Sequence, residues 1–198
     1  MKFNPDGTSA GEITTTGSTY FLDIVYDQDL QMDVIYQPDG TNGVIRKLNT
    51  SGVELGTLGT GHIISPISVA ATADGGVVVS DASSSAPNAP FRALVKINAD
   101  NSVAWTISQG ALGNLAAVFG IAVDTDGSIL VADAGGNKVV RFSATRTLLA
   151  TYGQAGGALG ELTMPVDIMV DVGRNFYVSE VGNSRVQKFN SDGVVQTE

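Results

Sequence analysis

Two aspartates, Asp23 and Asp167, occupy the same position of a short apolar phrase that recurs along the chain. Ser68 and Gly120 fill that position in the other two copies of the phrase. Carboxylates are preferred ligands of hard cations such as calcium, which takes six to eight oxygen ligands. Two acids and a serine supply only part of that shell, so backbone carbonyls and water would have to provide the rest. The alternative is that both aspartates are hydrated acids or turn acceptors at the start of a strand.

His62 is the single histidine of the chain and lies in the Gly-rich segment 56–66. A histidine can act as a general base because its pKa lies near neutrality. It then needs an orienting carboxylate and a nucleophile within reach, and nearby Ser65 lacks the pattern of a nucleophile elbow. The alternative is a solvated loop histidine. Since the chain has one histidine and no cysteine, we predict no catalytic residue, no resident metal and no cofactor, with calcium as the one candidate ion.

Two acid–amide pairs, Asp133 with Asn137 and Glu180 with Asn183, bound the breaks between expected strands. Short acceptor side chains at such breaks bind backbone amides and hold the loop. Contact with a partner molecule is the alternative. The nearby segment 124–128 is similar to a calcium loop, but it lacks the closing glutamate of an EF-hand. Its Asp-Gly pair predicts a hairpin turn instead.

The composition narrows the class of protein. The chain has 198 residues with 20 acidic and 11 basic side chains, giving a net charge of −9, which argues against a nucleic-acid partner. No apolar run approaches the roughly 20 residues that cross a bilayer, so we expect no membrane insertion. Charged residues make up only 16% of the chain and glycines number 24, which is typical of a tight, turn-rich, all-β protein.

Two phrases repeat in register along the whole chain, at steps of about 45 to 49 residues. Each copy of the first phrase has an apolar residue followed by a polar turn. The apolar residues of the five copies are Phe3, Leu48, Ile97, Phe142 and Phe189. The second phrase is the apolar run that contains the two aspartates: 22–27, 67–72, 119–124 and 166–171. A period of this length indicates a repeat architecture.

Within one repeat, short runs rich in β-branched residues alternate with Gly, Asp or Asn. Residues 119–152 divide into expected strands at 121–124, 129–133, 139–143 and 148–152. The first strand is apolar almost continuously, so both of its faces should be buried. The third carries Arg141 between apolar residues and is expected to be a half-exposed outer strand. Four short antiparallel strands per repeat predict a β-propeller without helices.

The repeat resembles an NHL repeat most closely at 119–142, and the linker from Tyr152 to Pro165 also matches. The copy at 165–193 has Glu180 where the pattern usually has Asp. The copies at 20–59 and 66–108 are degenerate, with Gln37 in place of the Asp and an insertion at 82–91. The resemblance covers nearly the whole chain and implies an NHL-repeat β-propeller.

The resemblance leaves two classes of function open, because propellers host many activities. The first is a non-catalytic binding or scaffolding module that recognises a protein, peptide or glycan through the loops on one face of the ring. The second is a lyase or lactonase-like hydrolase, since similar six-bladed rings include such enzymes, with a cation held in the channel by Asp23 and Asp167. A sensor domain of a larger receptor is also compatible with the family.

The repeat count predicts an incomplete ring. We expect one propeller domain over residues 1–198, with a half-blade at 1–16 and blades at approximately 19–60, 66–109, 118–153 and 165–198. NHL-type rings typically have six blades, and the same half-blade phrase is written at both ends of this chain, at 2–7 and 188–193. We therefore expect an arc of a larger propeller, or a ring completed by another chain. The low lysine content and absence of cysteine favour a bacterial protein of the extracellular or periplasmic space over a cytoplasmic one.

Overall fold

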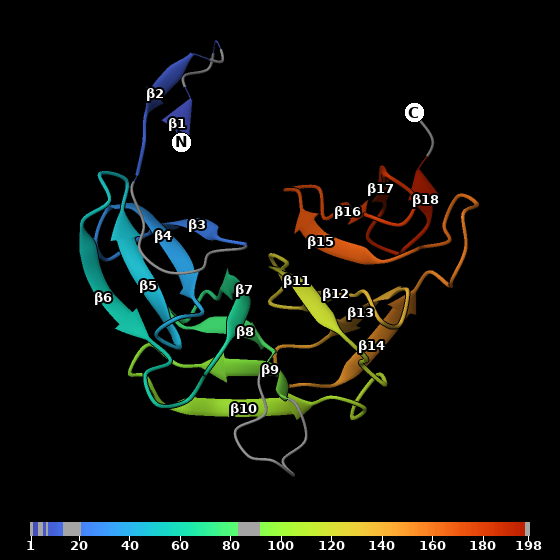
Figure 1. Ribbon diagram of the computed structural model, residues 1–198, viewed down its shortest axis with the longest axis horizontal. Coiled ribbons are helices and arrows are strands. Elements are labelled where there is room, and N and C mark those ends of the chain that lie inside the picture. Colours follow the sequence, from blue (N-terminus) through green and yellow to red (C-terminus); the bar gives the residue numbers. More distant parts are fainter. Residues whose placement is uncertain (1, 4–5, 7, 14–20, 83–91, 197–198) are drawn as a thin grey trace.

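The computed structural model describes residues 2–3, 6, 8–13, 21–82 and 92–196, and all regular structure in these ranges is β-strand. Four sheets of four antiparallel strands follow one another along the chain as the blades of a β-propeller (Figure 1). Blade 1 contains β3 (Asp23–Asp27), β4 (Met32–Asp39), β5 (Val44–Asn49) and β6 (Glu54–Leu58). Blade 2 contains β7 (Pro66–Ala71), β8 (Val77–Asp81), β9 (Arg92–Ile97) and β10 (Val103–Ser108). Blade 3 contains β11 (Val118–Val123), β12 (Ile129–Asp133), β13 (Lys138–Phe142) and β14 (Leu148–Tyr152), and blade 4 contains β15 (Pro165–Val170), β16 (Phe176–Glu180), β17 (Arg185–Phe189) and β18 (Val195–Gln196).

The strands of each blade pair in chain order, so the connections fall at two opposite ends of the blades. We call one end the loop face, which carries the segments between blades and the turns between second and third strands. The other end is the turn face, which carries the turns between first and second and between third and fourth strands. This arrangement confirms the predicted fold class.

The first hairpin turn of blades 2 to 4 requires a residue with left-handed backbone. Gly75 and Gly127 have φ of 76° and 78°, which glycine adopts without steric cost. Asp126 accepts a hydrogen bond from the Ser128 amide at 2.9 Å, which fixes the predicted Asp-Gly turn. Blade 4 places Arg174 at the equivalent position, with φ of 63°.

The core lies between the blades rather than within one sheet. Three buried apolar clusters fill the junctions of blades 1 and 2, blades 2 and 3, and blades 3 and 4. In the last of these, the rings of Phe176 and Phe189 stack with their centroids 4.9 Å apart. The innermost strands β7 and β11 are largely buried, as predicted. The innermost strands of the two outer blades differ, because Ile24 of β3 and Met169 of β15 are 54% and 59% exposed.

Two details of the predicted repeat are wrong. The third strand of blade 3 is not half-exposed, because β14 lies outside it and Arg141 is only 6% exposed. In blade 1 the acid of the repeat is not replaced by Gln37, because Asp39 occupies its position. Strand β4 is longer than its counterparts, and Asp39 pairs with Val44 as Asp133 pairs with Lys138.

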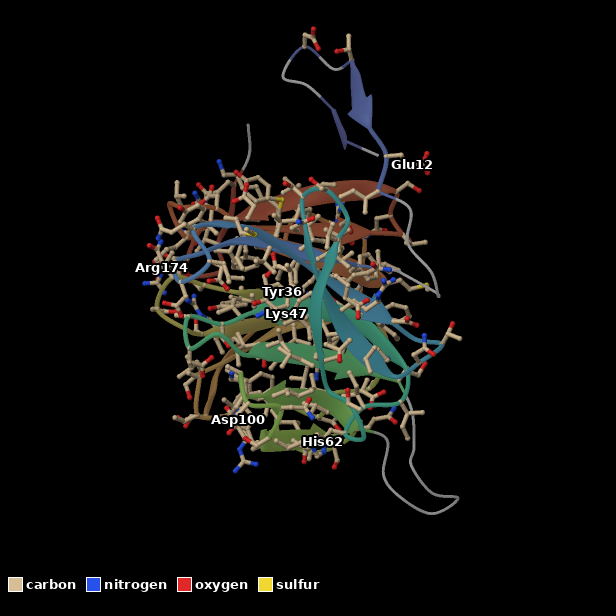
Figure 2. All side chains as sticks on the ribbon, turned by 90° about the vertical axis from the view of Figure 1, so that its left-hand side faces the viewer. Glu12, Tyr36, Lys47, His62, Asp100 and Arg174 are labelled. Atoms are coloured by element: carbon tan, nitrogen blue, oxygen red, sulfur yellow. The ribbon has the colours of Figure 1, made fainter. Side chains whose placement is uncertain are left out.

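The N-terminal segment forms a separate hairpin of β1 (Lys2–Phe3) and β2 (Ser9–Gly11), which stands apart from the blades (Figures 1 and 2). The C-terminal blade is built from β15–β18 alone, so neither hairpin strand completes it. Neighbouring innermost strands contact one another from β3 to β7, β11 and β15. Among the described residues no comparable contact joins β15 back to β3.

Candidate functional site

The innermost strands of all four blades line one cavity of about 470 Å³. Most of its lining residues are apolar in type, but the surface that they expose to the cavity is mostly polar, and the oxygen-bearing side chains among them are those of Asp23, Ser68 and Asp167. The structure therefore brings together the three polar residues that the sequence phrase aligned. Only Ser68 and Asp167 are equivalent in the sheets, because Asp23 pairs with Tyr36 as Met169 pairs with Tyr177. The remaining lining comes from residues 21–22, 25, 69–71, 121–123, 168–170.

Asp23 uses both carboxylate oxygens to hold backbone. Its Oδ2 accepts a hydrogen bond from the Ala71 amide at 2.8 Å, which ties β3 to β7 of the next blade. Its Oδ1 accepts one from the amide of Ile24 at 2.8 Å. A cation at Asp23 would have to share these oxygens with the two amides.

Asp167 is the more available carboxylate. Its Oδ1 accepts a hydrogen bond from the Ile168 amide at 2.9 Å, and no described residue donates to its Oδ2. Burial raises the pKa of Asp167, because the charged form loses hydration in this partly apolar cavity. Gly120 makes room for it: a Cβ at position 120 would lie 2.7 Å from Oδ1.

Ser68 is buried, and a side chain of the neighbouring strand β8 binds its backbone amide. Its amide donates to the Ser80 hydroxyl at 3.0 Å, and that hydroxyl donates to the Phe119 carbonyl at 2.9 Å. Among the described residues, no group of three His, Cys, Asp or Glu side chains could hold a metal ion. The cavity thus offers one carboxylate oxygen, Oδ2 of Asp167, that accepts no hydrogen bond from the described residues, within a lining whose exposed surface is mostly polar.

On the loop face, Asp133 and Glu180 are fully engaged with their own loops. Asp133 accepts hydrogen bonds from the amides of Ala116 and Ala117, the latter at 2.8 Å. Glu180 accepts from the Thr163 amide at 2.8 Å and from Arg185 at 2.7 Å. Burial opposes ionisation of Glu180, but the hydrogen bonds from Arg185 and its neighbours keep its pKa below the usual range.

The two asparagines have matching tasks. Asn137 accepts a hydrogen bond from the Met164 amide at 2.8 Å. Asn183 donates to the Gly156 carbonyl at 3.0 Å and to Glu180 at 2.7 Å. The four loop-face residues therefore tie down loops, and their contact with a partner stays a prediction.

His62 lies in the connection between β6 and β7, where its amide donates to the Gly59 carbonyl at 2.8 Å. It does not line the central cavity, and Figure 2 shows it well away from Arg174 on the turn face. The structure therefore does not bring His62 together with Asp23 and Asp167, and its role as a general base at the mouth of the ring stays a prediction. The predicted insertion at 82–91 lies almost wholly outside the described residues.

Three features were not predicted from the sequence, and two of them lie on the loop face. Asp81 has the same task as Asp133, since it accepts from the amides of Ile64 and Ser65, but the insertion that follows it conceals the repeat. The loop face also exposes a set of large apolar side chains: Ile64, Leu112, Leu159, Met164 and Val181. A single apolar residue within each Gly-rich or turn segment is the signal that could have found them.

A third missed feature lies on the turn face, where blade 4 joins blade 3. Arg141 contacts buried Asp124 at 2.5 Å and donates to the Ser191 carbonyl of blade 4 at 3.0 Å. Arg174 reaches the same Asp124 at 3.0 Å and also pairs with Asp126. The periodicity places Arg141 on a face of the blade, but only the neighbouring blade buries it.

The fold and these sites define an all-β protein of the β-propeller class with four four-stranded blades. No helix in the described ranges is long and apolar enough to cross a membrane. The sequence matches no family model and no curated protein, so the resemblance to NHL repeats stays a prediction.

Solved structures resemble the chain in fold. A virginiamycin B lyase from Staphylococcus aureus matches 98% of this chain and 60% of its own, with a TM-score of 0.63 and 12% identity. A gluconolactonase from Xanthomonas campestris matches 87% of this chain and 59% of its own, with a TM-score of 0.60 and 16% identity. A Bacteroides caccae protein of unknown function matches 98% and 71%, with a TM-score of 0.67 and 14% identity. The chain thus spans less than two thirds of the lyase and the gluconolactonase, and identities this low establish the fold alone.

Proposed function

We propose that this propeller is a non-catalytic binding module that recognises a protein or peptide through its loop face. The observation that carries the proposal is the set of exposed apolar side chains on that face, at Ile64, Leu112, Leu159, Met164 and Val181. The turns of the opposite face also expose apolar side chains, among them Val172, but those of the loop face lie in segments that hydrogen bonds hold in place, which favours contact with a protein.

The rigid loops support this proposal over a glycan ligand. Asp133, Glu180 and Asn183, which could bind sugar hydroxyls, already bind the backbone or side chains of their own loops. A loop face held in this way presents its apolar side chains in fixed positions. Little ordering entropy is then lost when a partner binds.

A phage-displayed library of random peptides, panned on the immobilised chain, tests the proposal. We expect enriched peptides to contain apolar anchors and to bind at least tenfold more weakly to a Met164→Asn, Val181→Ser variant. Asparagine suits position 164, where φ is 50°. Leu149→Ser is the matched control, because Leu149 is equally exposed but lies on the outermost strand β14. Peptides that bind both variants as tightly as the parent would refute the assignment.

A second candidate is catalysis with a cation in the central cavity, in line with the lyase and gluconolactonase that share the fold. It is favoured by one observation, the half-buried Asp167, whose Oδ2 accepts no hydrogen bond from a described residue. Cation binding to the native state alone raises thermal stability by mass action. A melting temperature several degrees higher in calcium than in EDTA, with the difference abolished by Asp167→Asn, would support this candidate. No difference between calcium and EDTA would leave the binding module as the proposed function.

A further inference from the structure

The first hairpin turns of blades 2, 3 and 4 share one backbone on the turn face. They hold the same pair of backbone hydrogen bonds and align residue by residue: 72–76, 124–128 and 171–175. Asp74 of blade 2 therefore corresponds to Asp126 of blade 3. Gly127 of blade 3 corresponds to Arg174 of blade 4. The junction of blades 3 and 4 can thus be used as a template for the junction of blades 2 and 3.

At the junction of blades 3 and 4, a guanidinium from blade 4 binds the acids of blade 3. Arg174 pairs with Asp124 at 3.0 Å and also with Oδ2 of Asp126. The other oxygen of Asp126, Oδ1, accepts a hydrogen bond from the Ser128 amide at 2.9 Å. One oxygen of this acid therefore holds its own turn, and the other holds a cation that comes from the next blade.

At the junction of blades 2 and 3, the acid is present but Gly127 supplies no side chain to meet it. Oδ1 of Asp74 accepts hydrogen bonds from the Gly76 amide at 3.1 Å and from Lys96 at 2.8 Å. No described residue donates to Oδ2 of Asp74, which corresponds to the oxygen of Asp126 that binds Arg174. A cavity of about 410 Å³ lies at this junction.

This cavity, which we call the Asp74 pocket, combines a carboxylate with an apolar lining. Its exposed surface is mostly apolar and comes largely from Ala71, Val78, Trp105, Val123, Ile129 and Ala144. Asp74 also lines the pocket, and its side chain is 60% exposed, so a ligand from solvent can reach it. The pocket therefore suits a ligand that has both a cationic head and an alkyl body.

The other charged side chains of the lining favour a cation over an anion. Lys96 has three ammonium hydrogens, and its nitrogen has three acceptors: Thr72, Asp74 and the Ile97 carbonyl. It therefore keeps no hydrogen for an anionic ligand. The carboxylate of Asp124 is held by the two arginines of the next junction. Oδ2 of Asp74 is thus the charged atom of the lining that is available to a ligand.

We propose that the Asp74 pocket binds a guanidinium group carried on a short alkyl chain, which is the chemistry of an arginine side chain. Oδ2 of Asp74 accepts hydrogen bonds from the guanidinium, as Oδ2 of Asp126 does from Arg174. The apolar lining packs against the methylene groups, and the ring of Trp105 attracts the cation. The pocket lies on the turn face, so this proposal is independent of the binding function proposed for the loop face.

Titration of the full chain with n-butylguanidine, followed by tryptophan fluorescence, tests the proposal. We expect a saturable change, because Trp105 is the single tryptophan and lines the pocket. n-Butylamine has the same alkyl chain with an ammonium head and should bind roughly threefold or more weakly, because it lacks the planar donor fork. N-acetylarginine methylamide distinguishes the sources of the ligand. If it binds as tightly as n-butylguanidine, an arginine of a peptide is the ligand, and weaker binding indicates a free guanidinium compound.

Asp74→Asn removes the proposed counter-charge with little change in size. It should weaken n-butylguanidine binding at least tenfold. Asp100→Asn is the matched control, because it removes the same charge from an exposed position of the same blade that does not line the pocket. Thermal melts confirm that both variants are folded. An absence of saturable binding by the parent, or equal binding by the parent and Asp74→Asn, would overturn the proposal.

An arginine introduced from blade 3 tests the pocket without an added ligand. Gly127→Arg copies the arrangement of Arg174, since φ is 78° at Gly127 and 63° at Arg174. A Cβ at position 127 would lie 3.7 Å from the Cβ of Ala144, which is an ordinary contact. Gly127→Gln is the matched control, because it has the same backbone strain and a neutral side chain.

Gly127→Arg should melt about 1 to 4 °C above Gly127→Gln, because its guanidinium pairs with Asp74. This difference should vanish when both chains also carry Asp74→Asn. The introduced side chain should also occupy the pocket and weaken n-butylguanidine binding at least tenfold. Equal melting temperatures of the two Gly127 variants, or undiminished n-butylguanidine binding by Gly127→Arg, would contradict the proposal.

Discussion

The two junctions that flank blade 3 solve the same packing problem with different chemistry. Between blades 3 and 4, the turn face holds an ionic network in which Arg141 and Arg174 share Asp124. Asp124 is almost completely buried, and the Ser128 hydroxyl accepts a further bond from Arg141 at 2.9 Å. The cations come from two different blades, so the network joins them.

Between blades 2 and 3 the equivalent positions hold a smaller network. Lys96 replaces the arginine, and its ammonium donates to Thr72 and Asp74 at 2.8 Å each. Gly127 stands where blade 4 has Arg174, and a cavity of about 410 Å³ lies beside it. Trp105 borders that cavity, packs against the apolar cluster and donates to the Ala144 carbonyl at 3.2 Å.

The same backbone register therefore accommodates an extended ionic network at one junction and an aromatic ring beside a smaller network at the other. Ionic networks in buried sites carry a desolvation cost, so each charge depends on its partners staying in place. An aromatic ring contributes mainly through buried area and tolerates loss of one polar contact. The two junctions should therefore respond differently when one member is removed.

The largest expected effect is the loss of Asp124. Asp124→Ala leaves the buried Arg141 guanidinium without its main counter-charge and should lower the free energy of unfolding by about 3 to 5 kcal/mol. The equivalent change in blade 2, Thr72→Ala, removes a neutral acceptor and should cost about 1 kcal/mol. Urea unfolding of both variants measures the difference. Equal losses would show that the two junctions are energetically alike.

Removal of the aromatic ring comes next. Trp105→Ala should cost about 2 to 3 kcal/mol, because a large, partly buried side chain leaves the junction of blades 2 and 3. Trp105→Phe keeps most of the apolar area and should cost about 1 kcal/mol. Circular dichroism follows the unfolding, since Trp105 is the single tryptophan. A phenylalanine variant as unstable as the alanine variant would mean that the Ala144 hydrogen bond dominates.

A smaller effect is expected at Arg174, where the ion pairs oppose backbone strain. Arg174 is partly exposed and has φ of 63°. Arg174→Ala loses the ion pairs and keeps the strained backbone, so its melting temperature should fall by about 2 to 4 °C. Arg174→Gly relieves the backbone strain, so its melting temperature should fall by less. Added salt should narrow the gap between the parent and both variants, because exposed ion pairs are screened. A glycine variant less stable than the alanine variant would contradict this account.

The sequence predicted the backbone of the propeller closely. In blade 3, the expected strands at 129–133 and 148–152 coincide with β12 and β14, and the first strand begins three residues earlier than expected. Asp-Gly turns and the period of the apolar phrases carry this information, because both are local. All three predicted residues line one cavity, but the phrase misplaced Asp23, which pairs with Tyr36 and so stands where blade 4 has Met169 rather than Asp167.

The side-chain partners between blades could not be predicted in this way. Alternation along β13 assigns Arg141 to a face, but whether that face is covered depends on the next blade. The pairing of Arg174 with Asp124 joins residues 50 positions apart. Burial of a charged strand residue is therefore a property of the junction rather than of the repeat, which is why the third strand was expected to be half-exposed.

The smallest expected effect concerns the acids of the two networks at low pH. Burial opposes ionisation of Asp74, but hydrogen bonds from Lys96 and Thr72 lower its pKa to about 2. An aspartate in the unfolded chain has a pKa of about 3.9, so the stabilisation from Asp74 is complete above about pH 4 and is lost as the pH falls towards 2. Asp74→Asn should therefore melt slightly below the parent at pH 7 and match it near pH 2. Burial likewise opposes ionisation of Asp126, but hydrogen bonds from Ser128 and the charges of Arg174 and Arg141 lower its pKa. Asp126→Asn, at the junction of blades 3 and 4, should therefore also melt below the parent at pH 7 and approach it at low pH. Melting curves between pH 2 and 7 measure the stability of both variants. If the difference in melting temperature between a variant and the parent does not shrink at low pH, the carboxylate removed in that variant does not supply the pH dependence.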